Sequence, residues 1–288
     1  MQEKNSCKLL PPTPIYHNLP QTATMAIMKL VSGLVSNSYR ELLEELTKRE
    51  IKQRYKQSIL GYAWVILNPL IQMIVMAFVF SKILRIANLG VPYPIFLYAG
   101  LLPWTLFSNS LMSSANALVG NGGLLTKIYF PRQIFVQSTI LAKIVDFFLA
   151  STVFILFMIF YRLPVNLNVL WFIPIFIIQN FFTYGISLLA AAFNLFYRDI
   201  QYLLGLLLLV WMYLTPVIYP VEMFPPQYRF IFQLNPMAVF LNAYRQVILG
   251  GSSPNLVSLG VGLALSIIIY VIAIRIFKKL EGVFADVV

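Results

Sequence analysis

The chain has 288 residues, of which 59% are hydrophobic and only 11% charged, and its mean hydropathy is +0.79. A soluble domain carries roughly 25% charged residues, so the composition excludes a water-soluble protein and predicts one that crosses a membrane several times. The formal net charge of +11 does not indicate nucleic acid, because most Lys and Arg fall on one side of the predicted topology and follow the positive-inside rule.

The first 38 residues are expected to form a flexible cytoplasmic tail. They contain the sequence PPTPIYHNLP and no apolar stretch of the kind found in signal peptides. Met25 or Met28 could equally be the true start of the protein. The single cysteine, Cys7, excludes a disulfide within the chain.

Residues 39–58 predict an amphipathic interface helix that lies along the inner face of the membrane. Its apolar residues form two stripes at helical spacing, and the second stripe is rotated relative to the first. The first stripe comprises Tyr39, Leu42, Leu43 and Leu46, and the second comprises Ile51, Tyr55 and Ile59. This rotation predicts a break near residues 47–50. A generic juxtamembrane anchor is the alternative interpretation.

Two membrane spans are predicted next, over residues 59–80 and 95–119. Each is long enough to cross a hydrocarbon core of about 30 Å at about 1.5 Å per residue. The second span contains the polar sequence SNSLMSSANA, in which Ser110 and Ser114 share one helical face. Small polar residues of this kind favour close helix packing, and lining a wet path is the alternative.

Residues 120–132 return the chain to the basic side, and a third helix follows over residues 133–161. This helix is too long for one bilayer crossing, so its first part is expected at the inner membrane surface. Lys143 and Asp146 lie three residues apart and can pair on one face. We interpret them as a structural pair at the inner interface, with a proton relay as the alternative.

The fourth span is predicted over residues 167–196 and the fifth over residues 200–218, with an inner turn between them. The outer segment that follows contains two short helices, at about residues 220–250. In the second, Asn235 and Pro236 suit the N-cap and first position of a helix. This helix is too short to cross the bilayer, so a re-entrant or surface helix is expected.

The sixth and last span is predicted over residues 256–274, and residues 278–288 are expected to be a cytoplasmic tail. The predicted fold is therefore an all-α membrane protein with six transmembrane helices over residues 59–277, an N-terminal amphipathic interface helix and short outer re-entrant helices before the last span. Both termini are cytoplasmic in this topology, because a seventh span would place the basic C-terminal residues outside.

The sequence contains no GxxxxGK[ST] phosphate loop, no HExxH and no CxxC, and its only histidine is His17 in the N-terminal tail. Ion-coupled transporters and proton pumps need charged residues within the membrane, and none falls near the middle of a predicted span. We therefore expect neither catalysis nor a metal or cofactor site in this chain.

The chain is rich in aromatic residues, with 23 Phe, 16 Tyr and 4 Trp. Interfacial belts account for most of them by default. Some could instead line a translocation path, because aromatic faces pack against the apolar faces of sugar rings. These candidates are Tyr62, Trp64, Tyr98, Trp104, Phe107, Trp211 and Tyr213.

Several motifs resemble those of one family. They are REIKQRYKQSILGYAWVILNP at 49–69, LLTKIYFPRQIF at 124–135, YRDI at 197–200, TPVIYP at 215–220 and NPMAVFLNAYRQVILGGSSP at 235–254. In them the chain resembles the permease subunits of type-2 ABC exporters, above all those that export O-antigen, capsule or teichoic-acid polysaccharides on a lipid carrier. It departs mildly from the pattern at Glu50 and Ile51, where Asp-Leu is usual.

The resemblance implies a homodimer in the bacterial inner membrane, bound to two copies of a separate ATPase subunit that holds ATP and Mg. It also implies a lipid-linked polysaccharide as substrate. A type-2 permease for drugs or lipids has the same topology and remains an alternative, as does a stand-alone channel or a membrane-embedded enzyme. Neighbouring genes for an ATPase and for glycosyltransferases would favour the polysaccharide exporter.

The resemblance further implies roles for three groups of residues. The coupling helix that docks into the ATPase would contain Lys127, Ile128, Tyr129, Phe130, Pro131 and Arg132. The interface helix, which could attract the diphosphate of the lipid carrier, would use Arg49, Lys52, Arg54, Tyr55 and Lys56. The outer gate would contain Asn235, Pro236, Tyr244 and Arg245.

Overall fold

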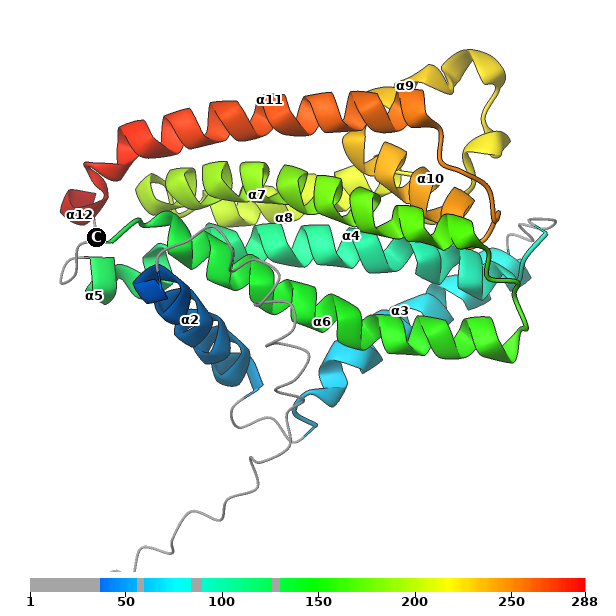
Figure 1. Ribbon diagram of the computed structural model, residues 1–288, viewed down its shortest axis with the longest axis horizontal. Coiled ribbons are helices and arrows are strands. Elements are labelled where there is room, and N and C mark those ends of the chain that lie inside the picture. The colour runs from blue at the N-terminus through cyan, green and yellow to red at the C-terminus, as the bar shows by residue number, and fades with distance from the viewer. Residues whose placement is uncertain (1–36, 56–59, 84–89, 126–129, 288) are drawn as a thin grey trace, which may run out of the picture.

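The computed structural model describes residues 37–55, 60–83, 90–125 and 130–287, and every regular element among them is a helix. The long helices lie side by side along the longest axis of the molecule (Figure 1). The short helices α9 (Phe230–Leu234) and α10 (Pro236–Ile248) lie at one end of this bundle. Helices α2 (Asn37–Tyr55), α5 (Gly122–Leu125) and α12 (Phe284–Val287) lie at the other end.

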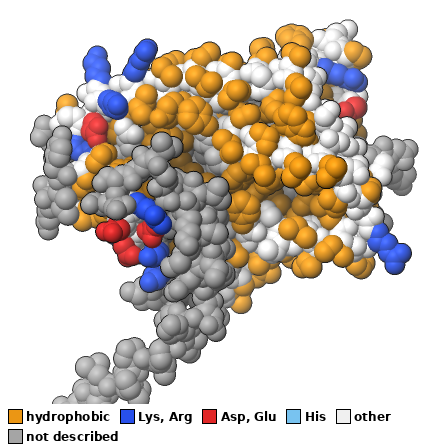
Figure 2. Space-filling view, viewed as in Figure 1, with side chains coloured by type: hydrophobic (Ala, Val, Ile, Leu, Met, Phe, Trp, Pro, Cys, Tyr) orange, Lys and Arg blue, Asp and Glu red, His pale blue; other side chains and the backbone are white. Residues whose placement is uncertain are grey.

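Among the described residues, five helical stretches are long and apolar enough to cross a membrane. They are Ala63–Ser81, Tyr93–Ala115, Gln133–Phe160, Leu167–Phe196 and Leu256–Glu281. Hydrophobic side chains cover the middle of the face seen in Figure 2, whereas Lys, Arg, Asp and Glu gather toward its two ends. The prediction of an all-helical membrane protein is confirmed.

The predicted fifth span is a shorter apolar helix, α8 (Ile200–Leu214). It ends four residues before the predicted end at Ile218. Thr215 already adopts an extended backbone, with φ −101° and ψ 136°, because the ring of Pro216 disfavours the helical conformation in the residue before it.

The first candidate span begins with α3 (Ala63–Phe78) and continues as the π-helix η2 (Val79–Ile83). Its predicted start, Ile59, lies outside the described residues. Gly61 has a φ of +50°, a left-handed conformation that glycine adopts without steric cost and that a helix cannot continue through. The helix therefore starts after this glycine, with Pro69 in its interior as predicted.

Helix α4 (Tyr93–Ala115) is the centre of the protomer. In its most apolar stretch 78% of the residues are buried, against 33% or less in the other candidate spans. Ser110 and Ser114 are fully buried, which supports the prediction that small polar residues allow close packing here. Helices α3, α6 (Gln133–Phe160), α7 (Phe172–Phe196), α8 and α10 all pack against α4.

The predicted break in the interface segment is wrong, because α2 is one continuous helix. Thr47 was expected to belong to the polar break, but its side chain is fully buried. Its hydroxyl donates a hydrogen bond of 2.7 Å to the carbonyl of Leu43 within the same helix, and this satisfied hydroxyl can be buried at little cost. Thr47 thus joins the buried Leu46 and Ile51 into one gradually rotating stripe.

The last long helix, α11 (Leu256–Glu281), packs closely against α7. A Cβ added to Gly185 of α7 would lie 3.1 Å from Cα of Tyr270, so the glycine permits this close approach. The chain does not become a loose tail after residue 277. Helix α11 continues to Glu281, and Phe284 of α12 is fully buried against Phe196 and Phe277.

Candidate functional site

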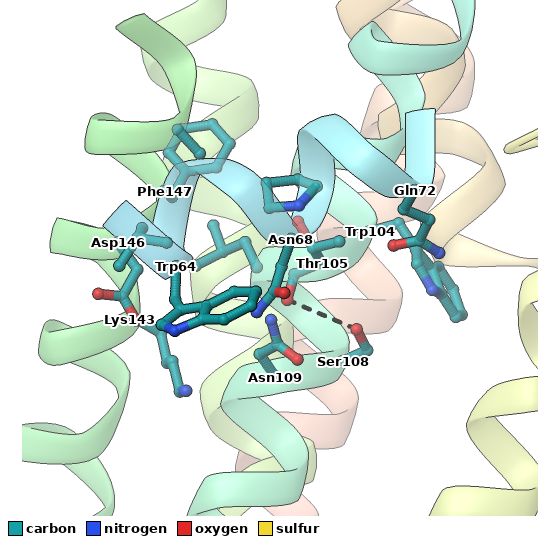
Figure 3. Close-up of a pocket in the computed structure, with 14 residues that line it drawn as sticks. Trp64, Asn68, Gln72, Trp104, Thr105, Ser108, Asn109, Lys143, Asp146 and Phe147 are labelled. Carbon is teal, nitrogen blue, oxygen red and sulfur yellow. Dashed lines mark hydrogen bonds between the residues drawn. The ribbon is translucent and has the colours of Figure 1, made fainter. Parts of the chain in front are cut away.

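A cavity of about 540 Å³ lies among α3, α4 and α6, and most of the side chains that line it are polar or aromatic (Figure 3). Its polar side chains are Asn68, Gln72, Thr105, Ser108, Asn109, Lys143 and Asp146. Its aromatic side chains are Trp64, Trp104 and Phe147. Polar groups within apolar helices are costly unless they face one another or a cavity, so this cavity is the candidate functional site.

Each of the three helices supplies one face to the cavity. Residues 64, 68 and 72 recur every four positions along α3, residues 105, 108 and 109 share one face of α4, and residues 143, 146 and 147 share one face of α6. Spacings of three and four place side chains above one another on a helix. Figure 3 shows Trp64, Asn68, Thr105 and Asn109 pointing toward one another from α3 and α4.

The two hydroxyls of the cavity are bound to the backbone of α4. Thr105 Oγ1 donates to the carbonyl of Leu102 at 2.9 Å, and Ser108 Oγ donates to the carbonyl of Thr105 at 3.5 Å. Because each hydroxyl proton is used within the helix, the oxygen is left to accept a hydrogen bond. Asn68 and Asn109 are exposed, and each amide can both donate and accept.

Lys143 and Asp146 bring one positive and one negative charge to the cavity. Both side chains are half-buried. They were predicted as a structural pair at the inner interface, and they line the same cavity as Trp104 and Thr105, which lie midway along α4. Their formal charges cancel, so the charged lining of the cavity sums to zero.

The aromatic residues predicted for the path occupy different settings. Trp64 and Trp104 line the cavity. Tyr98 and Phe107 are fully buried in the protomer; Tyr98 donates its hydroxyl to the carbonyl of Ala150 at 3.2 Å. The remaining three lie outside this cavity: Tyr62 directly before α3, the half-buried Trp211 on α8, and Tyr213 on α8 with 56% of its surface exposed.

Three of the four residues predicted for the outer gate are buried: Pro236, Tyr244 and Arg245. The guanidinium of Arg245 donates to the carbonyls of Pro216 and Val217, the latter at 2.6 Å. Its central carbon lies 3.7 Å from the centre of the Phe96 ring. Tyr244 is also buried, and its ring lies 5.4 Å from that of Phe172. These contacts fix α10 to α4 and to the segment after α8.

Asn235 connects three elements at the same end of the bundle. Its Oδ1 accepts hydrogen bonds from the backbone N–H of Met237 and from Nε1 of Trp211, at 3.1 and 3.0 Å. Its Nδ2 donates to Oγ1 of Thr215 at 2.9 Å. The predicted N-cap is therefore confirmed, with Pro236 at the first position of α10. The same side chain also holds α8.

Part of the predicted coupling helix can be located. Lys127, Ile128 and Tyr129 lie outside the described residues. The ring of Phe130 packs edge-on against Phe135, with 5.3 Å between ring centres. Pro131 is exposed and Arg132 directly precedes α6.

The interface helix α2 packs along α6. Tyr39 donates its hydroxyl to Oε1 of Gln137, whose Nε2 donates to the hydroxyl of Tyr184 at 3.0 Å. Burial raises the pKa of Tyr39 to about 12, so this tyrosine stays neutral. Arg49 and Lys52 are exposed on α2. The helix also includes residues 54 and 55, whose side chains lie outside the description, as does the whole of Lys56.

Sequence reasoning had not assigned Asn68, Gln72, Thr105, Ser108 or Asn109 to a site. A pattern in the first two spans could have indicated them. In each of these spans the polar residues follow a tryptophan at intervals of mostly three or four positions. That spacing shows which residues share a face, but it does not show which faces of the three helices meet.

Comparison with known proteins adds an independent finding. A family model described as ABC-2 type transporter matches residues 41–249. The O-antigen export system permease protein RfbA of Klebsiella pneumoniae is 31% identical over 249 residues, covering 86% of this chain and 95% of that protein. RfbA of Myxococcus xanthus is 32% identical with the same coverage. The polysialic acid transport protein KpsM of Escherichia coli is 24% identical, covering 83% of this chain and 93% of that protein.

Proposed function

The chain belongs to the ABC-2 type transporter family, and we propose that it is the permease that carries a lipid-linked polysaccharide of the O-antigen or capsule type across the bacterial inner membrane. The observation that carries this proposal is its similarity to several polysaccharide permeases over 93–95% of their length. Three of the predicted spans also surround a cavity lined by aromatic and amide side chains, which suits a sugar-bearing cargo.

We propose a topology of six crossings with both termini in the cytoplasm. The five long apolar helices and α8 would be the crossings. Helices α9 and α10, at the far end from α2 and α12 in Figure 1, would be on the outer side. The positive-inside rule supports this orientation, because the exposed Arg49, Lys52, Lys278 and Lys279 lie on elements at or toward the α2 end.

Energy would come from a partner. The sequence contains no phosphate loop, so two copies of a separate ATPase subunit would bind ATP and Mg and drive a homodimer of this permease. Residues 124–132 would dock into the ATPase, and α2 would transmit its motion and attract the diphosphate of the lipid carrier.

The glycan would pass along a path between the two protomers, formed by the first, second and fifth crossings. Among the candidate aromatic residues, Trp64 and Trp104 lie on the first and second crossings, and both line the cavity that these two form with the third. At the outer side, Asn235 and Arg245 would hold α10 against α4 and α8. The movable part of an outer gate would then be residues 221–234, whose side chains are mostly exposed.

Deleting the gene tests this function directly. Loss of the permease should remove the polysaccharide from the cell surface and leave the lipid-linked glycan inside the cell, and the intact gene should restore export. A mutant with normal surface polysaccharide would overturn the proposal. Sensitivity to drugs or altered membrane lipids in the same mutant, without a glycan defect, would support a drug or lipid permease instead.

A further inference from the structure

We propose that the cavity among α3, α4 and α6 is a subsite for uncharged sugar rings, so that this permease serves a glycan without acidic groups rather than an acidic polymer. This inference rests on the proposed function and deepens it. The relatives reported above differ in the cargo that their names give, since two are O-antigen export proteins and one is a polysialic acid transport protein. The charges and hydrogen-bonding groups that line the cavity distinguish an uncharged glycan from an acidic one.

The described lining of the cavity has no net formal charge. Among the described residues, Lys143 and Asp146 are the only ionisable side chains that line it, and their formal charges cancel. A site for an acidic polymer or a diphosphate needs an excess of Lys or Arg to offset the cost of moving an anion out of water. A carboxylate in the lining repels such a ligand. The exposed Arg49 and Lys52 on α2 offer that excess of positive charge elsewhere.

The lining of the cavity contains both hydrogen-bond donors and hydrogen-bond acceptors. A sugar hydroxyl both donates and accepts, so its site needs both functions close together. The amides of Asn68, Gln72 and Asn109 supply both. The hydroxyl oxygens of Thr105 and Ser108 supply acceptors, because their protons are bound to the backbone.

The aromatic lining and the volume of the cavity also suit a sugar ring. Trp64, with 39% of its surface exposed, offers a flat apolar surface beside the polar groups, and the buried Trp104 lines the same cavity. A sugar ring has apolar C–H faces between its hydroxyls. Trp104 is held in place by Phe107 and Trp211, whose ring centres lie 5.7 and 6.5 Å from its own. The volume of about 540 Å³ lies within the roughly 300–1,000 Å³ of small-molecule sites.

Two other cavities in the described part of the chain have a different lining. One, among α4, α6 and α10, is lined almost wholly by apolar side chains such as Leu102, Phe154 and Met158. The other, beside α8 and α9, has Asn235 as its only amide. The grouping of amides, hydroxyls and a compensated charge pair is therefore a property of the first cavity and not of every gap between these helices.

A thiol placed in the cavity tests its occupancy in the intact exporter. Cys7→Ser removes the only native thiol, and Asn109→Cys then places one in the cavity. Ser253→Cys, exposed in the loop before α11, is the matched control. In cells that export glycan, an uncharged maleimide should label the cavity thiol several-fold more slowly than in cells that make no lipid-linked glycan. The control thiol should react equally in both.

A third strain separates the sugar chain from the lipid carrier. Blocking elongation after the first sugar leaves the carrier diphosphate without a polymer, and the cavity thiol should then react as fast as in glycan-free cells. Equal labelling in all three strains would overturn the subsite. Protection by the one-sugar carrier equal to that by the full glycan would show that the cavity holds the carrier end and not the polymer, which also overturns the subsite.

Composition analysis tests the charge argument. The exported repeat unit should contain no carboxylate, phosphate or sulfate, and an acidic repeat unit would overturn the preference for uncharged sugars. The double variant Asn68→Ala and Asn109→Ala should reduce surface glycan several-fold, whereas Trp171→Leu, outside the cavity, should not. If deletion of the gene abolishes export but the double variant exports normally at normal protein levels, the subsite is wrong and the proposed function stands.

Discussion

The backbone N–H of Arg132 donates a hydrogen bond of 2.9 Å to Oε1 of Glu281, although 149 residues separate the two. Arg132 directly precedes α6, and Glu281 is the last residue of α11. The guanidinium carbon of Arg132 also lies 5.8 Å from the ring centre of the buried Phe284. The C-terminal turn thus holds the start of α6, next to the segment proposed to dock into the ATPase.

Removing this contact should weaken coupling more than assembly. In Glu281→Ala the N–H of Arg132 loses its acceptor, which costs about 1 kcal/mol at a helix start. We expect less glycan exported per ATP hydrolysed. Glu281→Gln keeps an acceptor oxygen and is the control. If Glu281→Ala exports as much glycan per ATP hydrolysed as the unchanged protein, the C-terminal turn plays no part in coupling.

Arg245 should be essential for the stability of the outer end. In Arg245→Met the carbonyls of Pro216 and Val217 lose their donors, and each hydrogen bond to a charged group contributes about 1.5–3 kcal/mol. Gly100→Ala should be harmful for the same reason, because its Cβ would collide with the Arg245 guanidinium. Both variants should lower the unfolding temperature of the purified protein. An unchanged Tm in both variants would show that the hydrogen bonds of Arg245 do not stabilise this end of the protein.

Asn194 should be a second polar anchor, at the opposite end of α4. Its Nδ2 donates to the carbonyl of Ala115 at 2.9 Å, and its Oδ1 accepts from the backbone N–H of Gln201 at 3.0 Å. Asn194→Leu leaves these buried groups unpaired, at a cost of about 1–3 kcal/mol. Protease sensitivity of the turn between α7 and α8 should rise. Asn180→Leu, which removes only a bond within α7, is the comparison, and equal sensitivity of the two variants would argue against the anchor.

The basic residues of α2 should matter for export by their position and not by their charge alone. Replacing Arg49, Lys52 and Arg54 together by Gln should lower export, because a lipid diphosphate loses about 1 kcal/mol of attraction for each basic residue near the membrane surface. The control removes the same number of charges from the end of α11, with Arg275, Lys278 and Lys279 changed to Gln. Equal loss in both triple variants, at matched protein levels, would attribute the effect to net charge.

The sequence predicted the helical class and most of the helices, because long apolar stretches between basic flanks leave few alternatives. Two predictions from it were wrong, the break in α2 and the end of α8. Thr47 was treated as polar, but its hydroxyl is bound to its own helix and its surface is buried. The end of α8 was placed too late, although Pro216 was visible in the sequence and disfavours helix in the residue before it.

The site was harder to predict than the fold. Trp64 and Trp104 were named from their residue type, and both line the cavity. Tyr98 and Phe107 were named on the same grounds, but neither lines it and both are fully buried, while Trp104 keeps only 3% of its surface exposed. Residue type alone cannot separate these two pairs, because all four are aromatic residues on apolar helices. What separates them is which face of α4 meets α3, and that depends on packing across helices far apart in the sequence.

The burial of α4 has a consequence for how the protein is made. This helix is the least apolar of the five candidate spans and also the most enclosed, with Ser110 and Ser114 among its buried residues. A segment with so many polar groups gains little from entering lipid alone. We expect α4 to leave the insertion machinery together with its neighbours α3 and α6, so that biogenesis of this protein proceeds by groups of helices rather than one at a time.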